Sequence, residues 1–515
     1  MSSLETRSTR RPRRTGQPTA LVSRRGIQYR RLINPFQPLR VFSDDQVAHI
    51  HRSALSILER DGIKILLPEA RRRFATAGAI VSESDELVRI GADIVENALE
   101  TTLPRVDLHA LVPDHDTTIG EGHCAIGPVS GPPNVTDSIR GRRPGTLQDF
   151  SDFTRLSQSF DVIHLLGPCV EPQDVPSNLR HLEMTRTQLT LSEKVPFVYS
   201  RGTAQAEDCF AMIRLVHGID EVQFSSRVYC YTNINTNSPR QLDIPMARGI
   251  IDFASAGQLS MITPFTLAGA MAPITIPGAL TLAHAEALAG VTLSQLVRPG
   301  APVAYGSFTS NVDMKSGSPA FGTPEYVKAC FGAGQLARHI GLPWRSSAAT
   351  ASNVPDEQAT YETAMSLWGA LLGGCNIIMH SAGWLEGGLS ASLEKFIIDI
   401  EMLQTLAEIL QPMSLTDAEI GLEAIAEVPP GGHFFSTPHT MERYRTAFYS
   451  PLLSDWRNFG QWQEDGAKTA SQRASEIWQR TLREYRQPAR DPSVTEALNA
   501  YVERRRSEGG ASPLA

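Results

Sequence analysis

The sequence predicts an α/β fold in which parallel strands alternate with helices. Seven short apolar runs rich in β-forming residues follow one another after residue 160, and helical segments fit between them. Such alternation is typical of a parallel sheet, and seven to eight units in about 280 residues favour a closed barrel over an open sheet. We therefore expect a (β/α)8 TIM barrel with an N-terminal helical and loop extension and C-terminal helices.

The composition of residues 1–40 predicts a flexible, Arg-rich arm. Nine Arg and a single acid, Glu5, occur among residues 1–31, and almost nothing there can build a core. We interpret the arm as a solvated tail that partly drapes over a neighbouring subunit. Contact with an acidic partner or with nucleic acid is the alternative.

We expect residues 41–150 to form an N-terminal extension. Ser43 followed by Gln46 fits a capping box, and apolar residues from Val47 to Leu58 recur at helical spacing until Gly62. Beyond this helix the segment mixes helices with turns rich in Gly and Pro, so it does not look like a repeating unit.

We expect residues 151–436 to form the barrel domain. The strand runs lie at 162–167, 196–200, 228–233, 259–263, 303–307, 344–348 and 376–380. Helices fit at 204–217, 244–256, 279–297, 324–340, 357–373 and 391–410. An eighth unit is expected in 411–436. Residues 437–515 predict a C-terminal helical extension, in which Ser493 and Glu496 fit another capping box.

Composition excludes several classes of protein. The formal net charge of -7 argues against a general nucleic-acid binder. The six cysteines form no C-x-x-C pair, which favours reduced, buried thiols in a cytoplasmic protein. No run of eighteen apolar residues predicts a membrane span, and no apolar stretch behind the N-terminal arginines predicts a secretory signal.

The carboxyl ends of the strands predict where the chemistry lies, because TIM-barrel active sites are built there. These ends carry aromatic and amide side chains and few basic ones. The candidates for substrate binding are Tyr231, Asn233, Tyr305, Phe308, Asp313, Trp384, His433 and Phe435. The catalytic candidates are Gln358, His380 and Glu362.

This set of side chains suits a methylated cation better than a phosphate. Phosphate calls for Gly-rich loops with Lys or Arg, whereas quaternary ammonium groups are bound by aromatic cages. The hypothesis places Tyr231, Tyr305, Phe308, Trp384 and Phe435 in the cage. Asn233, Gln358 and His380 would orient the rest of the substrate, and Asp313 or Glu362 would add negative charge. For each aromatic alone, packing is the alternative.

No metal site is expected. His380, His433 and His439 lie in neighbouring segments, but no H-E-x-x-H or Cys-His pattern accompanies them.

Short motifs between roughly residues 40 and 487 carry a family resemblance. They are GPCVEPQDVP (167–176), AHAE (283–286) with AG (289–290), YGS (305–307), DMK (313–315), GTPE (322–325), DEQ (356–358), YE (361–362), SAGWLEGGL (381–389), EKF (394–396) with Asp399 and Glu401, GGHF (431–434) and PHT (438–440). Together they resemble the trimethylamine methyltransferase family, in particular its non-pyrrolysine, glycine-betaine-methyltransferase-like branch.

The resemblance implies a methyltransferase that moves a methyl group from a methylated amine to the Co(I) corrinoid of a separate corrinoid protein. No cofactor is then bound tightly by this chain, because the partner supplies the cobalamin and docks at the barrel mouth. The resemblance, together with the helical C-terminus, also implies a homo-oligomer. The net charge predicts no nucleic-acid partner, and the lack of a long apolar run predicts no membrane partner.

The absence of pyrrolysine favours a quaternary amine as the donor. Founding members of the family carry pyrrolysine in the barrel, whereas this chain has only standard residues. A quaternary ammonium already has a neutral amine as leaving group, so the protein needs only to orient the methyl group and exclude water. Glycine betaine, proline betaine and carnitine therefore fit better than trimethylamine.

One segment departs from the family pattern. After the sixth predicted strand the family has an acid and a lysine, where this sequence reads Thr350, Ala351, Ser352 and Asn353. Two alternatives follow: a binding or regulatory protein that has lost turnover, or a methyltransferase with a different acceptor.

Overall fold

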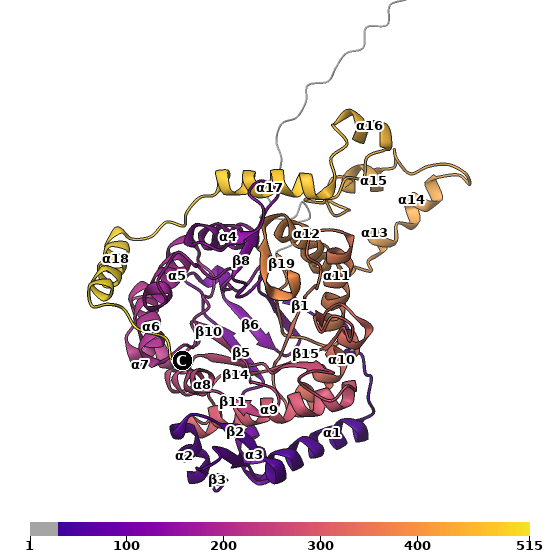
Figure 1. Ribbon diagram of the computed structural model, residues 1–515. Helices are drawn as coiled ribbons and strands as arrows, with labels where there is room; N and C mark the ends of the chain where they lie inside the picture. Colours follow the sequence, from indigo (N-terminus) through magenta and orange to yellow (C-terminus); the bar gives the residue numbers. More distant parts are fainter. Residues whose placement is uncertain (1–28, 515) are drawn as a thin grey trace, which may run out of the picture.

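A closed barrel of parallel strands forms the centre of the computed structural model, which describes residues 29–514 (Figure 1). Within these residues eight strand positions follow in ring order: β7 (His123–Ile126), residues 164–166, residues 195–198, β10 (Tyr231–Ile234), β12 (Leu259–Ile262), β14 (Val303–Gly306), β17 (Trp344–Ser347) and β18 (Ile377–Met379). Ile377 of β18 pairs in parallel with Ala125 of β7. The His164 amide donates to the Ile126 carbonyl over 2.8 Å, which closes the ring. The predicted (β/α)8 barrel is confirmed.

The strand that completes the barrel is not where the sequence placed it. The expected eighth unit in 411–436 holds only the short helices α13 (Asp417–Ile420) and α14 (Leu422–Glu427). The missing strand is β7, inside the segment 41–150 that we expected to be an extension. β7 has four residues and is followed by the strands β8 (Asn134–Thr136) and β9 (Arg143–Pro144) before a helix begins, which hides the strand–helix alternation.

One helix follows each barrel strand and covers the outside of the described barrel. In chain order these are α4 (Leu147–Ser159), α5 (Ser177–Leu191), α6 (Thr203–His217), α8 (Ile244–Ala256), α9 (Ile276–Val297), α10 (Pro324–His339), α11 (Glu357–Leu372) and α12 (Leu393–Ile409). The short α7 (Glu221–Ser225) lies between α6 and β10. The six helices predicted from the apolar periodicity differ from these by at most a few residues at their ends.

Helix α9 is long and apolar enough to cross a membrane by length and composition alone, but it is a core helix. In its most apolar window 78% is buried inside the protein. The N-terminal layer packs against it: α1 (Asp44–Ser56), β2 (Ile63–Ile65), α2 (Pro68–Thr76), β3 (Ile80–Ser82), β4 (Leu87–Arg89), α3 (Ala92–Leu99), with β11 (Gln241–Leu242) paired to β2. Ser43 and Gln46 form the predicted capping box of α1.

The amino-terminal end of the barrel is closed by a hairpin. Strands β5 (Arg105–Leu108) and β6 (Thr117–Gly120) pair antiparallel, and β1 (Leu32–Ile33) pairs with β7 beside them. Val106, Leu108 and Ile119 pack with the side chains of the barrel interior. Access to the barrel is therefore from the carboxyl ends of the strands, which we call the mouth.

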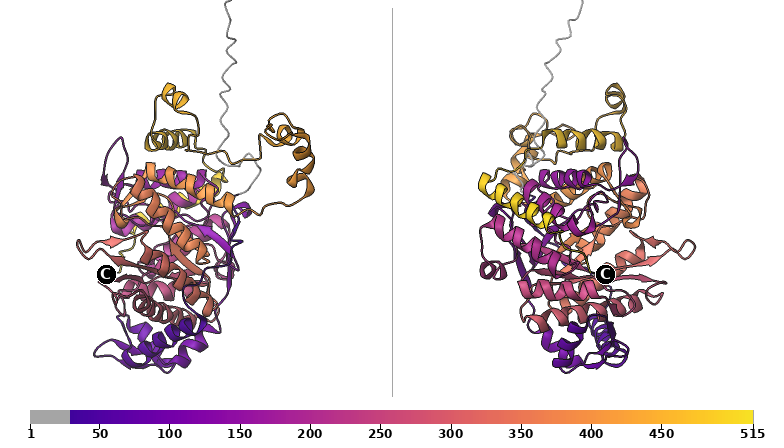
Figure 2. Two further views of the ribbon diagram at one scale, coloured as in Figure 1. Left: turned by 90° about the vertical axis from the view of Figure 1, so that its right-hand side faces the viewer. Right: turned by 60° about the vertical axis from the view of Figure 1, so that its left-hand side comes forward.

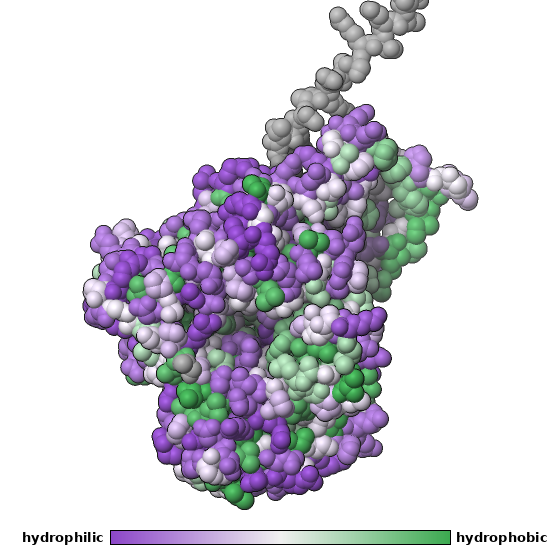
Figure 3. Space-filling model, in the orientation of Figure 1, coloured by the Kyte–Doolittle hydropathy of each residue, from purple (hydrophilic) through white to green (hydrophobic). Residues whose placement is uncertain are grey.

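Two small sheets rise around the mouth. One consists of β13 (Phe265–Ala268), β15 (Phe308–Val312) and β16 (Pro319–Ala320), and its hairpin projects from the body in Figure 2. The other joins β19 (Trp384–Leu385) and β20 (Ser390–Ser392) to β8 and β9. Figure 3 views this face and shows a hollow near its centre.

The C-terminal part of the chain is helical. After α13 and α14 come α15 (Pro438–Arg443), α16 (Phe459–Glu464), α17 (Ala470–Glu484) and α18 (Pro492–Ser507). Helix α17 lies across α12 and α4, and α18 packs on α5 and α6. The N-cap of α18 is Asp491, which accepts from the Ser493 amide, so the expected Ser493 cap was wrong. Residues 1–28 of the Arg-rich arm lie outside the described residues.

Candidate functional site

Three side chains from different strands meet at the mouth, and we call them the aromatic cluster: Phe308, His380 and Trp384. The His380 and Trp384 ring centroids lie 4.1 Å apart. Phe308 lies 5.4 Å from His380 and 6.2 Å from Trp384. Phe321 stacks on Phe308 from behind at 5.2 Å. The cluster therefore has a fixed geometry that is supported from one side.

Local backbone features hold the cluster in place. His380 directly follows β18 with a left-handed φ of 61°, and its amide donates to the Pro128 carbonyl over 3.1 Å. The Trp384 indole N–H donates to the Thr350 carbonyl over 3.2 Å. Gly388 lies against the indole, where a Cβ would come within 2.5 Å of the ring. The indole orientation is thus set by a hydrogen bond and by a glycine contact.

Arg345 is the charged group of this site. It lies on β17, and its guanidinium carbon is 5.8 Å from the centroid of the Phe308 ring. One Nη atom donates to Ser347 Oγ over 2.9 Å, while Nε has no hydrogen-bond partner. Arg345 is 2% exposed, and no carboxylate among residues 29–514 forms an ion pair with it. A buried cation without a counter-charge is costly, so its presence indicates an anionic ligand.

The protonation states of Arg345 and His380 follow from burial. Burial lowers the pKa of Arg345 to about 10, which leaves the guanidinium charged at neutral pH. Burial, and then the charge of Arg345, lower the pKa of His380 well below its usual value, so the imidazole is neutral. Its Nδ1 lies 3.1 Å from Ser347 Oγ. Ser347 therefore links the charged and the neutral side chain.

The structure brings together three of the predicted site residues, Phe308, His380 and Trp384. Gln358 and Glu362 lie behind them on α11. The Glu362 carboxylate accepts from Thr350 Oγ1 and from the Ala351 amide over 2.6 and 2.8 Å, and the Gln358 amide donates to it over 2.9 Å. Since the Thr350 carbonyl also accepts from the indole of Trp384, Glu362 supports the cluster through the backbone at residues 350–351.

Tyr231 and Tyr305 do not join the aromatic cluster. Tyr231 is fully buried in the barrel interior, and its hydroxyl donates to the Leu166 carbonyl. Tyr305 points outward, where its hydroxyl lies 3.1 Å from Nδ1 of His284 on α9. The prediction that Tyr305 forms part of the cage was therefore wrong, because its side chain is on the outer face of β14. Asn233 remains near the mouth, with its Oδ1 buried and without a hydrogen-bond partner.

Three further candidates lie away from the cluster. Asp313 accepts from the Lys315 and Ser316 amides in the exposed turn between β15 and β16. His433 and Phe435 lie in contact with each other at 5.5 Å, but in the segment that projects from the body after α12. Because this segment is not a barrel unit, they do not stand at a strand end.

Arg345 is the site residue that the sequence reasoning missed. Our rule selected residues after the ends of strands, whereas Arg345 lies within one. The available signal was an arginine in an otherwise uncharged strand run, two positions before Ser347 and hence on the same face.

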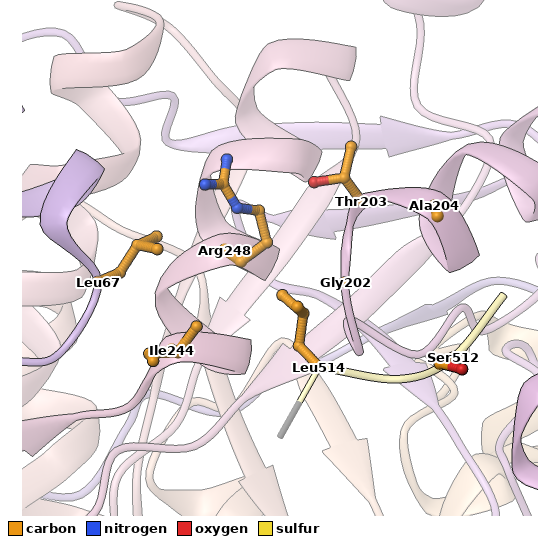
Figure 4. A pocket seen from close by; sticks show the side chains of 8 residues that line it. All are labelled: Leu67, Gly202, Thr203, Ala204, Ile244, Arg248, Ser512 and Leu514. Atoms are coloured by element: carbon orange, nitrogen blue, oxygen red, sulfur yellow. The ribbon is translucent and has the colours of Figure 1, made fainter.

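A separate cavity of about 430 Å³ lies beside the first turns of α6 and α8 (Figure 4). Leu67, Ile244 and Leu514 line it with the backbone at Gly202. Its charged residue, Arg248, is paired with Glu69 at 2.7 Å. This cavity therefore offers no free charge. Among residues 29–514 no group of three or more His, Cys, Asp or Glu side chains is arranged to hold a metal ion.

Comparisons with known proteins find similarity along nearly the whole chain. A family model described as Trimethylamine methyltransferase (MTTB) matches residues 6–510. The glycine betaine methyltransferase of Desulfitobacterium hafniense (strain Y51) is 34% identical over 472 residues, 91% of this chain and 98% of that protein. Trimethylamine methyltransferase MttB of Desulfitobacterium hafniense (strain DSM 10664 / DCB-2) is 29% identical over 473 residues, 92% and 95% of the two chains. Among solved structures, the Methanosarcina barkeri monomethylamine methyltransferase (MtmB) is 10% identical with a TM-score of 0.48, covering 88% of this chain and 97% of its own.

Proposed function

This chain belongs to the trimethylamine methyltransferase family, and from this premise we propose that it transfers a methyl group from a betaine to the Co(I) corrinoid of a separate protein. The names of the relatives support methyl transfer from a methylated amine, with glycine betaine or trimethylamine as the donor. The acceptor, a cytoplasmic location and the docking of the corrinoid protein at the mouth are parts of the same proposal.

The position of Arg345 beside the aromatic cluster favours a betaine as the donor. Aromatic faces attract a quaternary ammonium, and a guanidinium binds a carboxylate through charge-assisted hydrogen bonds. A betaine carries both groups a short distance apart. A donor with only the cation would be repelled by Arg345, by about 3 kcal/mol at 6 Å and an effective dielectric constant of 20. The pair of subsites therefore favours a zwitterion over choline.

For methyl transfer these residues need only to position the methylated donor. In the proposed step the corrinoid's Co(I) supplies the electron pair that bonds the methyl carbon, and the electrons of the broken C–N bond stay on nitrogen as a neutral tertiary amine. No proton has to be delivered to the leaving group, which agrees with a neutral His380. Arg345 holds the carboxylate, and Trp384 and Phe308 direct one methyl group toward the mouth.

The direct test is a methyl-transfer assay. The purified chain is mixed with a reduced corrinoid protein and with glycine betaine, proline betaine, carnitine or trimethylamine, and the methylated corrinoid is followed by its absorption spectrum. We expect methylation with at least one betaine and none with trimethylamine. Methylation with trimethylamine alone would contradict the proposed donor.

The altered segment at residues 350–353 motivates a second candidate, a binding protein without turnover. Thr350 holds the indole of Trp384, and Ala351 donates to Glu362, so the segment shapes the site without contributing a charged group. This candidate predicts calorimetric binding of a betaine with no spectral change for any corrinoid protein. Binding followed by methylation of a non-corrinoid thiol would favour the third possibility, a different acceptor.

A further inference from the structure

Tyr199 is a further aromatic side chain at the mouth. It directly follows the third strand position of the barrel, residues 195–198. Phe197 packs in the barrel interior, with its ring centroid 5.4 Å from that of Tyr231. Because side chains alternate along a strand, Tyr199 also points inward, one layer nearer the mouth. Its ring lies edge to face with that of Phe197 at 5.1 Å. Tyr199 therefore stands on the inner wall of the mouth.

The Tyr199 side chain keeps part of its surface free. The Arg201 guanidinium carbon lies over one face of the ring, 4.7 Å from the centroid. Glu171 accepts from Arg201 over 2.9 Å and from Arg180 over 2.6 Å, which partly offsets the charge of Arg201. The phenol hydroxyl forms no hydrogen bond with any residue among 29–514, and the side chain is partly exposed. Burial raises the pKa of Tyr199, so the phenol is neutral and its ring can contact a ligand.

Asn233 belongs to the same wall. It lies on β10, two positions after the inward-facing Tyr231, so it also points into the barrel. Its Nδ2 donates to Asn235 Oδ1 over 2.5 Å, whereas its Oδ1 is buried and has no hydrogen-bond partner. A buried acceptor without a partner is costly, so at a binding site it indicates that a ligand supplies the missing interaction.

Tyr199 and Asn233, which we call the far wall, lie opposite Arg345. In ring order residues 195–198 are the third strand position and β17 is the seventh. In an eight-stranded barrel alternate strands fill the same layers, so side chains from these two positions meet across the axis. The charge of Arg345 reaches this side of the barrel: burial raises the pKa of Tyr231, and Arg345 acts against that rise.

We infer that the donor lies across the mouth, with its carboxylate on Arg345 and its trimethylammonium group against the far wall. Tyr199 is then a further binding residue for the cation, an inference that rests on the proposed function. Like charges repel, so the cationic end of a betaine held by Arg345 turns away from the guanidinium. At the far wall the ring of Tyr199 offers a cation–π contact, and the unpaired Asn233 Oδ1 offers the negative end of a dipole.

Two ligands of the same shape test the role of Tyr199. In 3,3-dimethylbutanoate a carbon atom replaces the ammonium nitrogen of glycine betaine, and the carboxylate is kept. The full-length chain is titrated calorimetrically with each ligand, without a corrinoid protein. In Tyr199→Leu we expect the affinity for glycine betaine to fall by about tenfold to thirtyfold and that for 3,3-dimethylbutanoate by less than about threefold, because only the cation loses a cation–π contact. Tyr199→Phe keeps the ring and should bind glycine betaine within about twofold of the wild type.

Tyr229→Leu is the matched control. Tyr229 is a buried tyrosine outside the barrel interior, where its ring stacks on Phe224 at 5.7 Å. This variant should leave both affinities unchanged. Unchanged binding of glycine betaine in Tyr199→Leu, or equal losses for the two ligands, would overturn the inference. The proposed function would still stand in that case if the wild type binds glycine betaine. A wild type that binds no betaine would contradict both.

Asn233→Leu tests the other side chain of the far wall. Leu has a similar volume and removes the unpaired oxygen, so the urea midpoint should not fall. The affinity for glycine betaine should fall by about fivefold to tenfold, while that for 3,3-dimethylbutanoate should not fall. A lower urea midpoint with unchanged affinity would show that Asn233 supports the fold and does not contact the cation.

Discussion

Arg345 and Ser347 stand two positions apart on β17 and so point to the same side of the strand, into the barrel. The same alternation of side chains along a strand explains why Tyr305 was wrongly placed in the cage. On β14, Tyr305 follows Ala304, whose side chain packs in the barrel interior, so Tyr305 faces the opposite side of the strand. Its contact with His284 on α9 confirms this outward direction. A stricter use of strand alternation would have excluded Tyr305. Finding Arg345 also required its lack of an ion pair, which only the three-dimensional arrangement reveals.

At the residue scale, the variant Arg345→Met should have a more stable fold but a lower affinity for betaine. Removing a buried charge that has no counter-charge should stabilise the fold by about 1–3 kcal/mol, because the desolvation cost disappears. Betaine affinity should fall by about two orders of magnitude, because charge-assisted hydrogen bonds are lost. Denaturant titration and calorimetry measure the two effects. Loss of stability with unchanged affinity would show that Arg345 is structural.

Trp384→Ala should weaken betaine binding by roughly tenfold to thirtyfold, because a desolvated cation–π contact is worth about 2 kcal/mol. The matched variant is Tyr305→Phe, which removes only the hydroxyl that contacts His284. It should leave binding unchanged. Equal losses in the two variants would argue against the aromatic cluster as the ammonium site.

At the scale of elements, the six helices α6 and α8 to α12 were predictable because each is a long segment with recurring apolar residues between two short β-prone runs, whereas α4 and α5 were not predicted. Strand β7 was not, since four residues between glycine-containing turns give too short a pattern, and its helix α4 begins only after another hairpin. The expected barrel unit in residues 411–436 was wrong for a related reason. The short apolar stretches of this segment resemble a buried unit, but they are exposed on α13 and α14.

The contact between α12 and the loop that carries Trp384 depends on a buried ion pair. Lys395 Nζ is paired with Asp399, whose other oxygen accepts from the Gly383 amide over 2.8 Å. Lys395→Met should cost about 3–5 kcal/mol, because it leaves Asp399 buried without its partner. The double variant Lys395→Met/Asp399→Leu should recover much of this loss. Unfolding free energies from urea titration test it, and equal stability of all variants would refute the coupling.

At the scale of the whole molecule, buried histidines predict sensitivity to acid. Burial lowers the pKa of His164 to about 3, where the Ile126 amide donates to its Nδ1 over 3.0 Å, and lowers the pKa of His217 to about 4. The unfolded chain binds these protons near pH 6.5 and the folded chain does not, so stability falls as the pH drops below 6.5. Each such histidine contributes about 1.4 kcal/mol per pH unit down to its folded pKa.

Among residues 29–514, five carboxyls whose pKa is raised by burial oppose this trend: Asp152, Glu207, Asp252, Glu286 and Asp399. Burial raises the pKa of Asp252 and of Asp399 to about 6, so the folded state takes up these protons before the unfolded state does. In the same part of the chain the histidines with a lowered pKa still outnumber the carboxyls with a raised pKa, six to five: they are His51, His115, His164, His217, His284 and His380. Urea midpoints should fall steadily from pH 7 to pH 5. A midpoint that is constant over this range would contradict the buried neutral histidines.

The proposed site binds both charges of a zwitterion, and a pair of ligands tests this most directly. Glycine betaine and choline share the trimethylammonium group and differ in whether a carboxylate or a hydroxyl follows it. Calorimetric titration of the chain with each ligand, without any corrinoid protein, separates binding of the donor from methyl transfer. We predict that glycine betaine binds at least a hundredfold more tightly than choline and that Arg345→Met abolishes the difference. Equal affinities for the two ligands in the unmodified chain would show that Arg345 does not bind the carboxylate of the donor.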